Sequence, residues 1–221
     1  PGEQQRHAEI AVFIHSLSGG GAQRRTVTLV NGFAERGHTV DLVVVAARGP
    51  LLALLDPRVR LVALTDWVEP HPLARLPRRV QLFLGLGKIV RYLRRDRPGV
   101  FMAAASHVHV PVLIAHRIAA CDVPLVLRVS NHLSRSGSGG AKPKTRLFAP
   151  RLARRLYPHA DALIAVSRGV ADDVNAVTGY PRARIHALQS PILTDELRHR
   201  AEAPLEHPWF APGEPPVVLG V

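Results

Sequence analysis

Short apolar runs alternate with longer segments of helical period along most of this chain. Runs typical of buried strands cover Ile10–His15, Thr39–Val45, Val59–Leu64, Val100–Ala104, Leu125–Ser130 and Ala162–Ser167. Helical patterns cover Ala22–Glu35, Leu76–Leu93, Val110–Ala119, Arg146–Tyr157 and Gly169–Val177. Continuous apolar strands separated by helix-length crossovers favour a parallel sheet with both faces covered. The expected fold class is therefore α/β, a Rossmann-like doubly wound parallel sheet with helices on both faces.

A glycine loop follows the first expected strand. In doubly wound sheets, ligands bind at the carboxyl ends of the strands, and Gly19, Gly20 and Gly21 lie there, just before the first expected helix. Backbone N–H groups at the start of a helix attract phosphate, which makes this loop a candidate phosphate site. The loop lacks the third glycine of a dinucleotide-binding fingerprint, and no Walker Lys-Ser/Thr pair follows it. On spacing alone, a tight turn is an equally good interpretation.

Polar residues also follow two other expected strands. Ser130, Asn131 and His132 form a cluster in which His132 is suited to accept a proton or orient a hydroxyl. A solvent-facing loop histidine is the alternative interpretation of His132. His107 and His109 follow the fourth expected strand, and neither has an HExxH context or a carboxylate companion. We therefore expect no metal site.

The charge of the chain is strongly basic and unevenly distributed. The 221 residues include 29 Lys+Arg and 17 Asp+Glu, a formal charge of +12, and 26 of the basic residues are Arg. An Arg bias of this kind is typical of GC-rich codon usage, but the basic residues also concentrate in Arg75–Arg97 and Arg128–Arg155.

The aromatic residues of these two basic segments fall on apolar stripes, so we expect no nucleic-acid partner. An anionic membrane surface fits better, and a solvated face is the alternative. The arginines of this expected surface are Arg91, Arg94, Arg95, Arg151, Arg154 and Arg155.

Neither a secretory signal nor a membrane-spanning segment is visible in the sequence. The longest uncharged stretch, Pro98–His116, is interrupted by His, Pro and Gly residues. The single cysteine, Cys121, excludes an intramolecular disulfide framework and favours a reducing compartment. We expect a cytoplasmic location, either free or peripheral on the inner face of the cytoplasmic membrane.

The end of the chain differs in composition from the rest. Five prolines fall within Glu202–Pro216, which is typical of a linker, and the apolar run Val217–Val221 that follows is typical of a strand. The sequence therefore predicts a first domain over residues 1–201, a linker over residues 202–216, and the first strand of a truncated second domain over residues 217–221.

Four segments together resemble group 1 (family 4) retaining glycosyltransferases. These are Phe13–Arg24 (FIHSLSGGGAQR), Ala34–Val40 (AERGHTV), Ala160–Ser167 (ADALIAVS) and Arg184–Ile192 (RIHALQSPI). The resemblance implies a GT-B architecture, of which this chain would be the N-terminal, acceptor-side half. The Arg/Lys pair and the Glu-x7-Glu signature that bind the donor in this family belong to the other half. The chain departs from the family pattern at Ser190, where Asn is usual.

The resemblance also implies an activity, which is transfer of a sugar from a nucleoside diphosphate sugar to a hydroxyl acceptor with retention. It further implies a role in cell-envelope or lipid-linked glycan synthesis and no cofactor besides the donor. The Gly19–Gly21 loop would approach the donor diphosphate, with amides from Gly20 and Gly21, and His132 would be catalytic. The acceptor side would carry His107, His109, Ser130 and Asn131.

The truncated chain alone is expected to be inactive, with its nucleotide sugar bound through the absent half. Two alternatives stay open at this point, an NAD(P)-type Rossmann enzyme and a non-catalytic acceptor-binding module. In a dinucleotide-binding enzyme an acidic residue is expected at the end of the second strand, whereas Asp41 lies within that strand.

Overall fold

A computed structural model describes residues 7–68, 70–135, 152–191, 195–204, 207–210 and 213–218. The chain divides into two compact units, Pro1–Ser190 and Pro191–Val221. The division falls at Ser190, whereas the sequence places the end of the first domain at Ala201. Each unit is described by itself.

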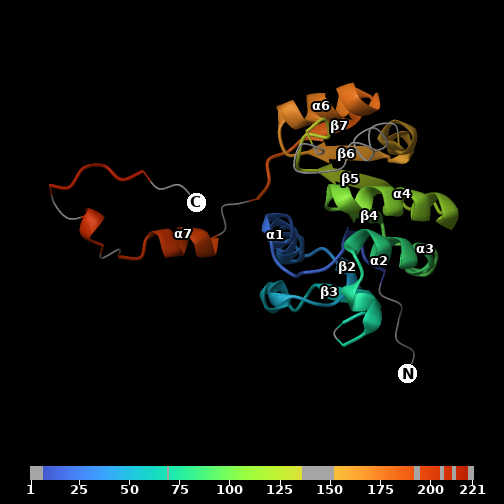
Figure 1. Cartoon of the computed structure of the whole chain (residues 1–221), viewed down its shortest axis with the longest axis horizontal. Coiled ribbons are helices and arrows are strands. Elements are labelled where there is room, and N and C mark those ends of the chain that lie inside the picture. The colour runs from blue at the N-terminus through green and yellow to red at the C-terminus, as the bar shows by residue number, and fades with distance from the viewer. Residues whose placement is uncertain are drawn as a thin grey trace. The chain divides into compact units, whose positions relative to one another are not determined.

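The first unit is built on a parallel sheet, which confirms the expected fold class. Over the described residues the order is β3-β2-β1-β4-β5-β6-β7, and every neighbouring pair is parallel (Figure 1). The strands are β1 (Ile10–Ile14), β2 (Val40–Ala46), β3 (Arg60–Thr65), β4 (Val100–Ala103), β5 (Leu125–Val129), β6 (Ala162–Ala165) and β7 (Ile185–Ala187). The order reverses between β1 and β4, and ligands of doubly wound sheets bind at the carboxyl edge near such a reversal.

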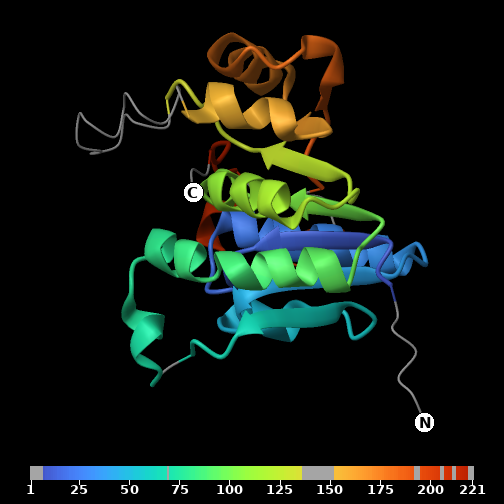
Figure 2. The same cartoon turned by 90° about the vertical axis from the view of Figure 1, so that its right-hand side faces the viewer.

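Helices cover both faces of the sheet (Figures 1 and 2). They are α1 (Gly21–Glu35), α2 (Arg78–Leu84), α3 (Leu86–Arg95), α4 (Ser106–Ala119) and α6 (Arg168–Thr178), and residues 152–156 are also helical. Helix α1 packs on the face that carries Val12 and Ile14, where it forms one apolar core. The helices α2, α3, α4 and α6 pack on the opposite face, where Phe13 and Phe101 lie in the second core. The burial of both faces explains why the strands are apolar at nearly every position.

Two expected helices differ from those observed. The pattern over 76–93 forms two helices, because Gly85 ends α2 and precedes α3. Glycine is a poor helix former, and a Cβ at Gly85 would lie 3.1 Å from the carbonyl oxygen of Gln81. Helix α4 begins at Ser106, four residues before the expected start, and contains Pro111. Proline disfavours a helix before it, which is why the sequence predicts a later start.

The second unit contains less regular structure. Its elements are α7 (Asp195–Ala201) and a 3₁₀ turn, Pro208–Phe210. The strand expected over residues 217–221 stays a prediction, because only Val217 and Val218 are described and they are not in a strand. Part of the expected helix Arg146–Tyr157 likewise lies outside the described residues.

Candidate functional site

The glycine loop lies at the carboxyl end of β1 and opens α1. Gly19 has a φ of +112° and Gly20 a φ of +101°, values that side chains rarely adopt. Gly20 is the N-cap of α1 and supplies no side-chain hydrogen bond to the helix, and the first turn of α1 holds no acidic residue. The first N–H groups of a helix have no partner within it, so this end of α1 remains the candidate site for an anion.

A buried histidine, His15, directly follows β1 and precedes this loop, and the sequence alone did not single it out. Nε2 of His15 lies 2.9 Å from Oε1 of Gln81, an acceptor, so Nε2 carries the proton in this contact. The same Oε1 accepts from Arg48 at 3.2 Å. Burial lowers the pKa of His15 to about 4, against the opposing effect of the Gln81 hydrogen bond. A polar residue that ends an otherwise apolar strand was the available signal.

The two histidines expected on the acceptor side lie on the first turns of α4, and their environments differ. His109 is fully buried, and its Nδ1 lies 2.8 Å from the hydroxyl of Tyr157. A side chain without exposed surface cannot touch an acceptor, so this assignment of His109 is corrected to a packing role. Burial lowers its pKa to about 4. His107 instead lines a groove of about 500 Å³ with Pro77, Arg78, Arg79 and Leu82.

His132 lies beside the N-terminal turn of α6. The position that a Cβ would take on Gly169, the second residue of α6, is 3.9 Å from Nε2 of His132. The loop around His132 is held to α6 because the backbone N–H of Leu133 donates to Oδ2 of Asp173 at 2.6 Å. Burial alone would raise the pKa of Asp173, but hydrogen bonds from Ser134 and Leu133 outweigh it and lower this pKa. Ser167 is the N-cap of α6, since its hydroxyl accepts from the N–H of Val170 at 3.2 Å.

The other two members of the polar cluster differ in exposure. Asn131 is exposed, whereas the hydroxyl of Ser130 is buried and has no hydrogen-bond partner among the described residues. The carboxyl edge of the sheet therefore carries the glycine loop and His15 after β1, and Ser130 and His132 after β5.

Two of the six arginines expected on a membrane surface cap helices instead. Arg94 donates to the carbonyls of Ile118 and Ala119 at 2.8 and 3.0 Å, at the end of α4. Arg154 donates to the carbonyl of Val177 at 2.8 Å, at the end of α6. Arg91, Arg94 and Arg95 line an open groove of about 420 Å³ on α3, and Arg155 is exposed. Arg151 lies outside the described residues.

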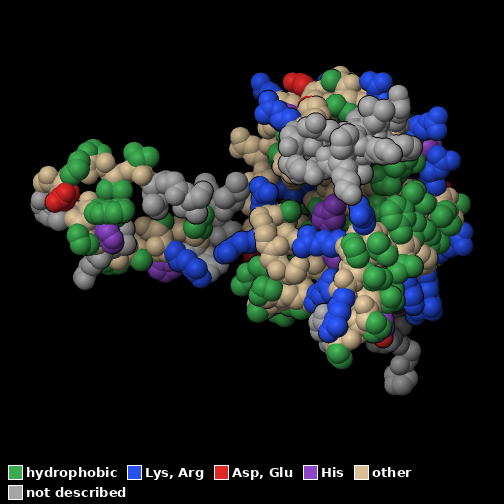
Figure 3. All heavy atoms as spheres, viewed as in Figure 1, with side chains coloured by type: hydrophobic (Ala, Val, Ile, Leu, Met, Phe, Trp, Pro, Cys, Tyr) green, Lys and Arg blue, Asp and Glu red, His purple; other side chains and the backbone are tan. Residues whose placement is uncertain are grey.

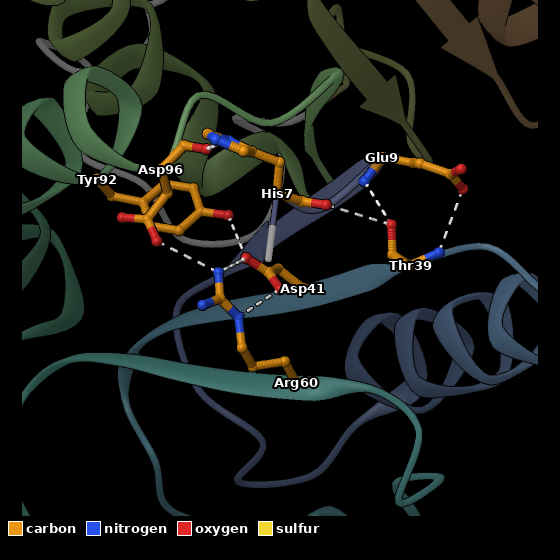
Figure 4. A network of polar contacts seen from close by, with 7 residues as sticks. All are labelled: His7, Glu9, Thr39, Asp41, Arg60, Tyr92 and Asp96. Carbon is orange, nitrogen blue, oxygen red and sulfur yellow. Dashed lines mark hydrogen bonds and ion pairs between the residues drawn. The ribbon is translucent and has the colours of Figure 1, made fainter. Parts of the chain in front are cut away.

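Asp41 lies at the opposite edge of the sheet, in a saturated polar network (Figure 4). It is the second residue of β2 and accepts from Nε of Arg60 at 2.8 Å and from the hydroxyl of Tyr92 at 2.6 Å. Arg60 also contacts Asp96 at 3.2 Å. An acid that binds the ribose of a dinucleotide lies at the carboxyl edge. Asp41 is therefore a structural residue, which disfavours the dinucleotide alternative.

No group of three or more His, Cys, Asp or Glu residues is placed to hold a metal ion in the part of the chain that the structure describes. Among the helices described, none is long and apolar enough to cross a membrane.

Comparison with known proteins identifies the family of this chain. The sequence model of Glycosyltransferase Family 4 matches residues 19–196. The chain belongs to this family. The match begins at the glycine loop and extends through β7, so it covers the glycine loop, Ser130 and His132, whereas His15 lies just before it. A search of curated proteins finds no match.

Solved structures show the same fold as this member of Glycosyltransferase Family 4. HepE from Anabaena, solved with UDP and glucose, is 20% identical with a TM-score of 0.58, over 89% of this chain and 50% of that one. Sucrose-phosphate synthase from Thermosynechococcus elongatus is 14% identical with a TM-score of 0.59, over 88% and 52%. The lipopolysaccharide outer core galactosyltransferase WaaB is 14% identical with a TM-score of 0.55, over 83% and 46%. The chain thus spans about half the length of these structures and has the fold of the N-terminal half of GT-B glycosyltransferases.

Proposed function

We propose that this chain is the acceptor-side half of an enzyme that transfers a sugar from a nucleoside diphosphate sugar to a hydroxyl, with retention. The observation that carries the proposal is the glycine loop at the start of α1, within the segment matched to Glycosyltransferase Family 4. HepE, which has the same fold, was solved with UDP and glucose. The donor is bound mainly by a second half that these residues do not include.

The proposed role of the loop follows from the charge of the leaving group. Breaking the glycosidic phosphate bond places negative charge on the departing diphosphate, and preorganised N–H groups stabilise such charge. The start of α1 supplies these groups together with the positive end of its helix dipole. Arg24 and Arg25 add positive charge in the same turn, which has no acidic residue. This chemistry requires no metal and no cofactor besides the donor.

We place the catalytic group on the acceptor side at His132, where it orients or polarises the hydroxyl. In the complete enzyme, His132→Ala is expected to lower kcat/KM about 100-fold, the scale of a single acid–base or polarising group. His159→Ala is the control, because His159 is a surface histidine that lies before β6, at the opposite edge of the sheet. Equal kcat/KM for wild type and His132→Ala would remove His132 from the mechanism. Retention is tested separately, by the anomeric configuration of the product.

The acceptor we propose is lipid-linked and is reached at an anionic membrane surface, as part of cell-envelope glycan synthesis. WaaB, which shares the fold, is a lipopolysaccharide galactosyltransferase. Helix α2 exposes Val80, Phe83 and Leu84, with exposed fractions of 37%, 52% and 54%. Arg78 and Arg79 on the same helix are also exposed.

Figure 3 shows apolar side chains gathered over α2, α3 and α4, with Lys and Arg at their edge. Apolar side chains flanked by arginines fit the boundary between headgroups and acyl chains. The centre of this surface is α2. The arginines that the sequence predicts for a membrane surface, Arg91, Arg94 and Arg95, lie on the next helix, α3.

A double substitution tests this docking surface. Phe83→Glu/Leu84→Glu is expected to lower binding to vesicles of phosphatidylglycerol and phosphatidylcholine at least tenfold, because it removes apolar insertion and adds repulsion. Leu54→Glu is the control, since Leu54 is 47% exposed but lies in a turn on the α1 side of the sheet. Co-sedimentation measures the binding, and undiminished binding of the double variant would exclude α2 as the docking surface.

A further inference from the structure

Arg128 is a buried cation near the carboxyl end of β5. The residue is 4% exposed, although it carries a guanidinium. The register places Arg128 level with Ile164 of β6, whose side chain packs in the apolar core on the α1 side of the sheet. Side chains alternate between the two faces of a strand, and Val126, two residues earlier, packs in that same core. Arg128 therefore extends from the sheet on the face that α1 covers.

The guanidinium of Arg128 is incompletely satisfied. Nη2 donates to the hydroxyl of Ser190 at 2.8 Å. Nη1 is buried and has no hydrogen-bond partner among the described residues, and no carboxylate of these residues pairs with Arg128. Burial, followed by the charge of Arg25, lowers the pKa of Arg128. A buried charge without a counter-charge opposes folding, which indicates that a ligand supplies the missing partner.

The path from Arg128 to the glycine loop is short and lined by small residues. Only β4 separates β5 from β1, and neighbouring strands lie about 4.8 Å apart. At this level β4 is followed by Ala104 and Ala105, which are buried in the core on the α1 side. Their small side chains leave room for a long side chain to cross β4 on the α1 face. Arg128 can thus reach toward the start of α1.

A second guanidinium lies at the glycine loop itself. Nε of Arg25 donates to the carbonyl of Gly21 at 3.0 Å, which holds this side chain against the first turn of α1. Its charge is close enough to act on Arg128. Two like charges repel, and an anion bound between them would remove the repulsion. The unpartnered hydroxyl of Ser130, two residues after Arg128, lies at the same edge and is a further donor.

We propose that Arg128, Arg25 and the first turn of α1 form a binding site for a phosphoryl group, with Arg128 as the residue that fixes its position. One guanidinium nitrogen of Arg128, Nη2, donates to the hydroxyl of Ser190, which leaves Nη1 for the phosphoryl group. Under the proposed function, which this inference extends, the phosphoryl group belongs either to the donor diphosphate or to a phosphorylated acceptor. Both sources share the same anionic oxygens, and the experiment distinguishes them.

Binding is measured first on the 221-residue chain, without a transfer reaction. Inorganic pyrophosphate is titrated calorimetrically into the wild type, Arg128→Met and Arg128→Lys. We expect the wild type to bind, Arg128→Met to bind at least tenfold more weakly, and Arg128→Lys to fall between them. Arg36→Met is the matched control, because Arg36 lies at the far end of α1 and bonds the carbonyl of Gly32. No pyrophosphate binding by the wild type, or equal binding by Arg128→Met, would overturn the proposal.

Thermal stability separates a binding role from a structural one. Methionine has a similar length and no charge, so Arg128→Met is expected to leave the melting temperature unchanged or higher, while pyrophosphate no longer raises it. A lower melting temperature of Arg128→Met with undiminished pyrophosphate binding would make Arg128 a structural residue. Because no sugar is transferred, pyrophosphate binding to this site stands or fails independently of the glycosyltransferase assignment.

The source of the phosphoryl group is then determined from the KM values of the complete enzyme for its two substrates. An increase in the KM for the nucleotide sugar in Arg128→Lys assigns the group to the donor. An increase in the KM for a phosphorylated acceptor, with the donor KM unchanged, assigns it to the acceptor. If neither KM changes while pyrophosphate binding is weakened, the site lies outside the reaction and the phosphoryl group is not a substrate group.

Discussion

Replacing Gly49 with alanine is expected to lower the free energy of unfolding by at least about 3 kcal/mol. Gly49 has a φ of +118° and a ψ of 159°, a conformation open almost only to glycine. A Cβ at this position would lie 2.1 Å from the carbonyl oxygen of Leu17 and 2.3 Å from the nitrogen of Ser18. These are backbone atoms held in place, since the N–H of Leu17 donates to the carbonyl of Arg48 at 2.9 Å. The overlap is therefore relieved only by moving the chain.

Gly19→Ala separates overlap from backbone strain. Gly19 has a similar φ of +112°, but a Cβ there would meet no atom within 4 Å. Its replacement is expected to cost only the strain, about 1–2 kcal/mol. Urea unfolding followed by circular dichroism measures both variants, and equal losses would show that the contact with Leu17 contributes nothing. Because Leu17 and Ser18 lead into the glycine loop, Gly49→Ala is also expected to weaken pyrophosphate binding.

The second large effect is expected at the amino edge of the sheet. Arg60→Met leaves the carboxylate of Asp41, whose side chain is 3% exposed, without its cationic partner. Removing one partner of a buried pair costs about 3–5 kcal/mol, and the 44% exposure of the Arg60 side chain reduces this to about 2 kcal/mol. The hydroxyl of Tyr92 still donates to Asp41, but it carries no charge. The variant is measured by urea unfolding at pH 7.

Arg58→Met is the control for this pair. Arg58 contacts Asp56 at 2.7 Å, and its side chain is 58% exposed, so we expect a much smaller loss of stability than for Arg60→Met, because water screens this pair. The double variant Asp41→Asn/Arg60→Met is expected to regain part of the lost stability, because a neutral amide is less costly to bury than a carboxylate. A double variant less stable than Arg60→Met would show that the charge of Asp41 is not the cause.

Most of the sheet could be predicted from the sequence. Strands buried on both faces are apolar at almost every position, so β1 to β6 are visible as runs to within two residues. Strand β7, with three residues, was not predicted as a strand, because two of its three side chains are exposed and no apolar run marks it. The break at Gly85 was not predicted, since the apolar period continues through it. The residues of a segment indicate whether it forms a helix or a strand. Where that helix or strand ends also depends on contacts with residues further along the chain.

The candidate site was only partly predictable. The glycine loop and its place before a helix are local features, and both are visible in the sequence. The burial of His109 beneath Tyr157 joins residues 48 positions apart, which no local pattern reports. The sequence predicts that Arg94 and Arg154 lie on a charged surface. In the structure, Arg94 caps the end of α4 and Arg154 caps the end of α6. In the sequence, Arg128 is one of many basic residues in the segment 128–155. Only the strand order of the sheet brings it close enough to Arg25 for the two charges to interact.

The sequence by itself determined the fold class, the glycine loop and the family to which the chain belongs. These follow from the spacing of apolar residues and from short sequence motifs, both of which depend only on residues that are close together in the chain. Only the tertiary structure decided which polar groups are buried, which are partnered and which are left to a ligand. Burial and pairing depend on the strand order and register, which bring Arg128 to within one strand of the glycine loop although more than 100 residues separate them in the chain.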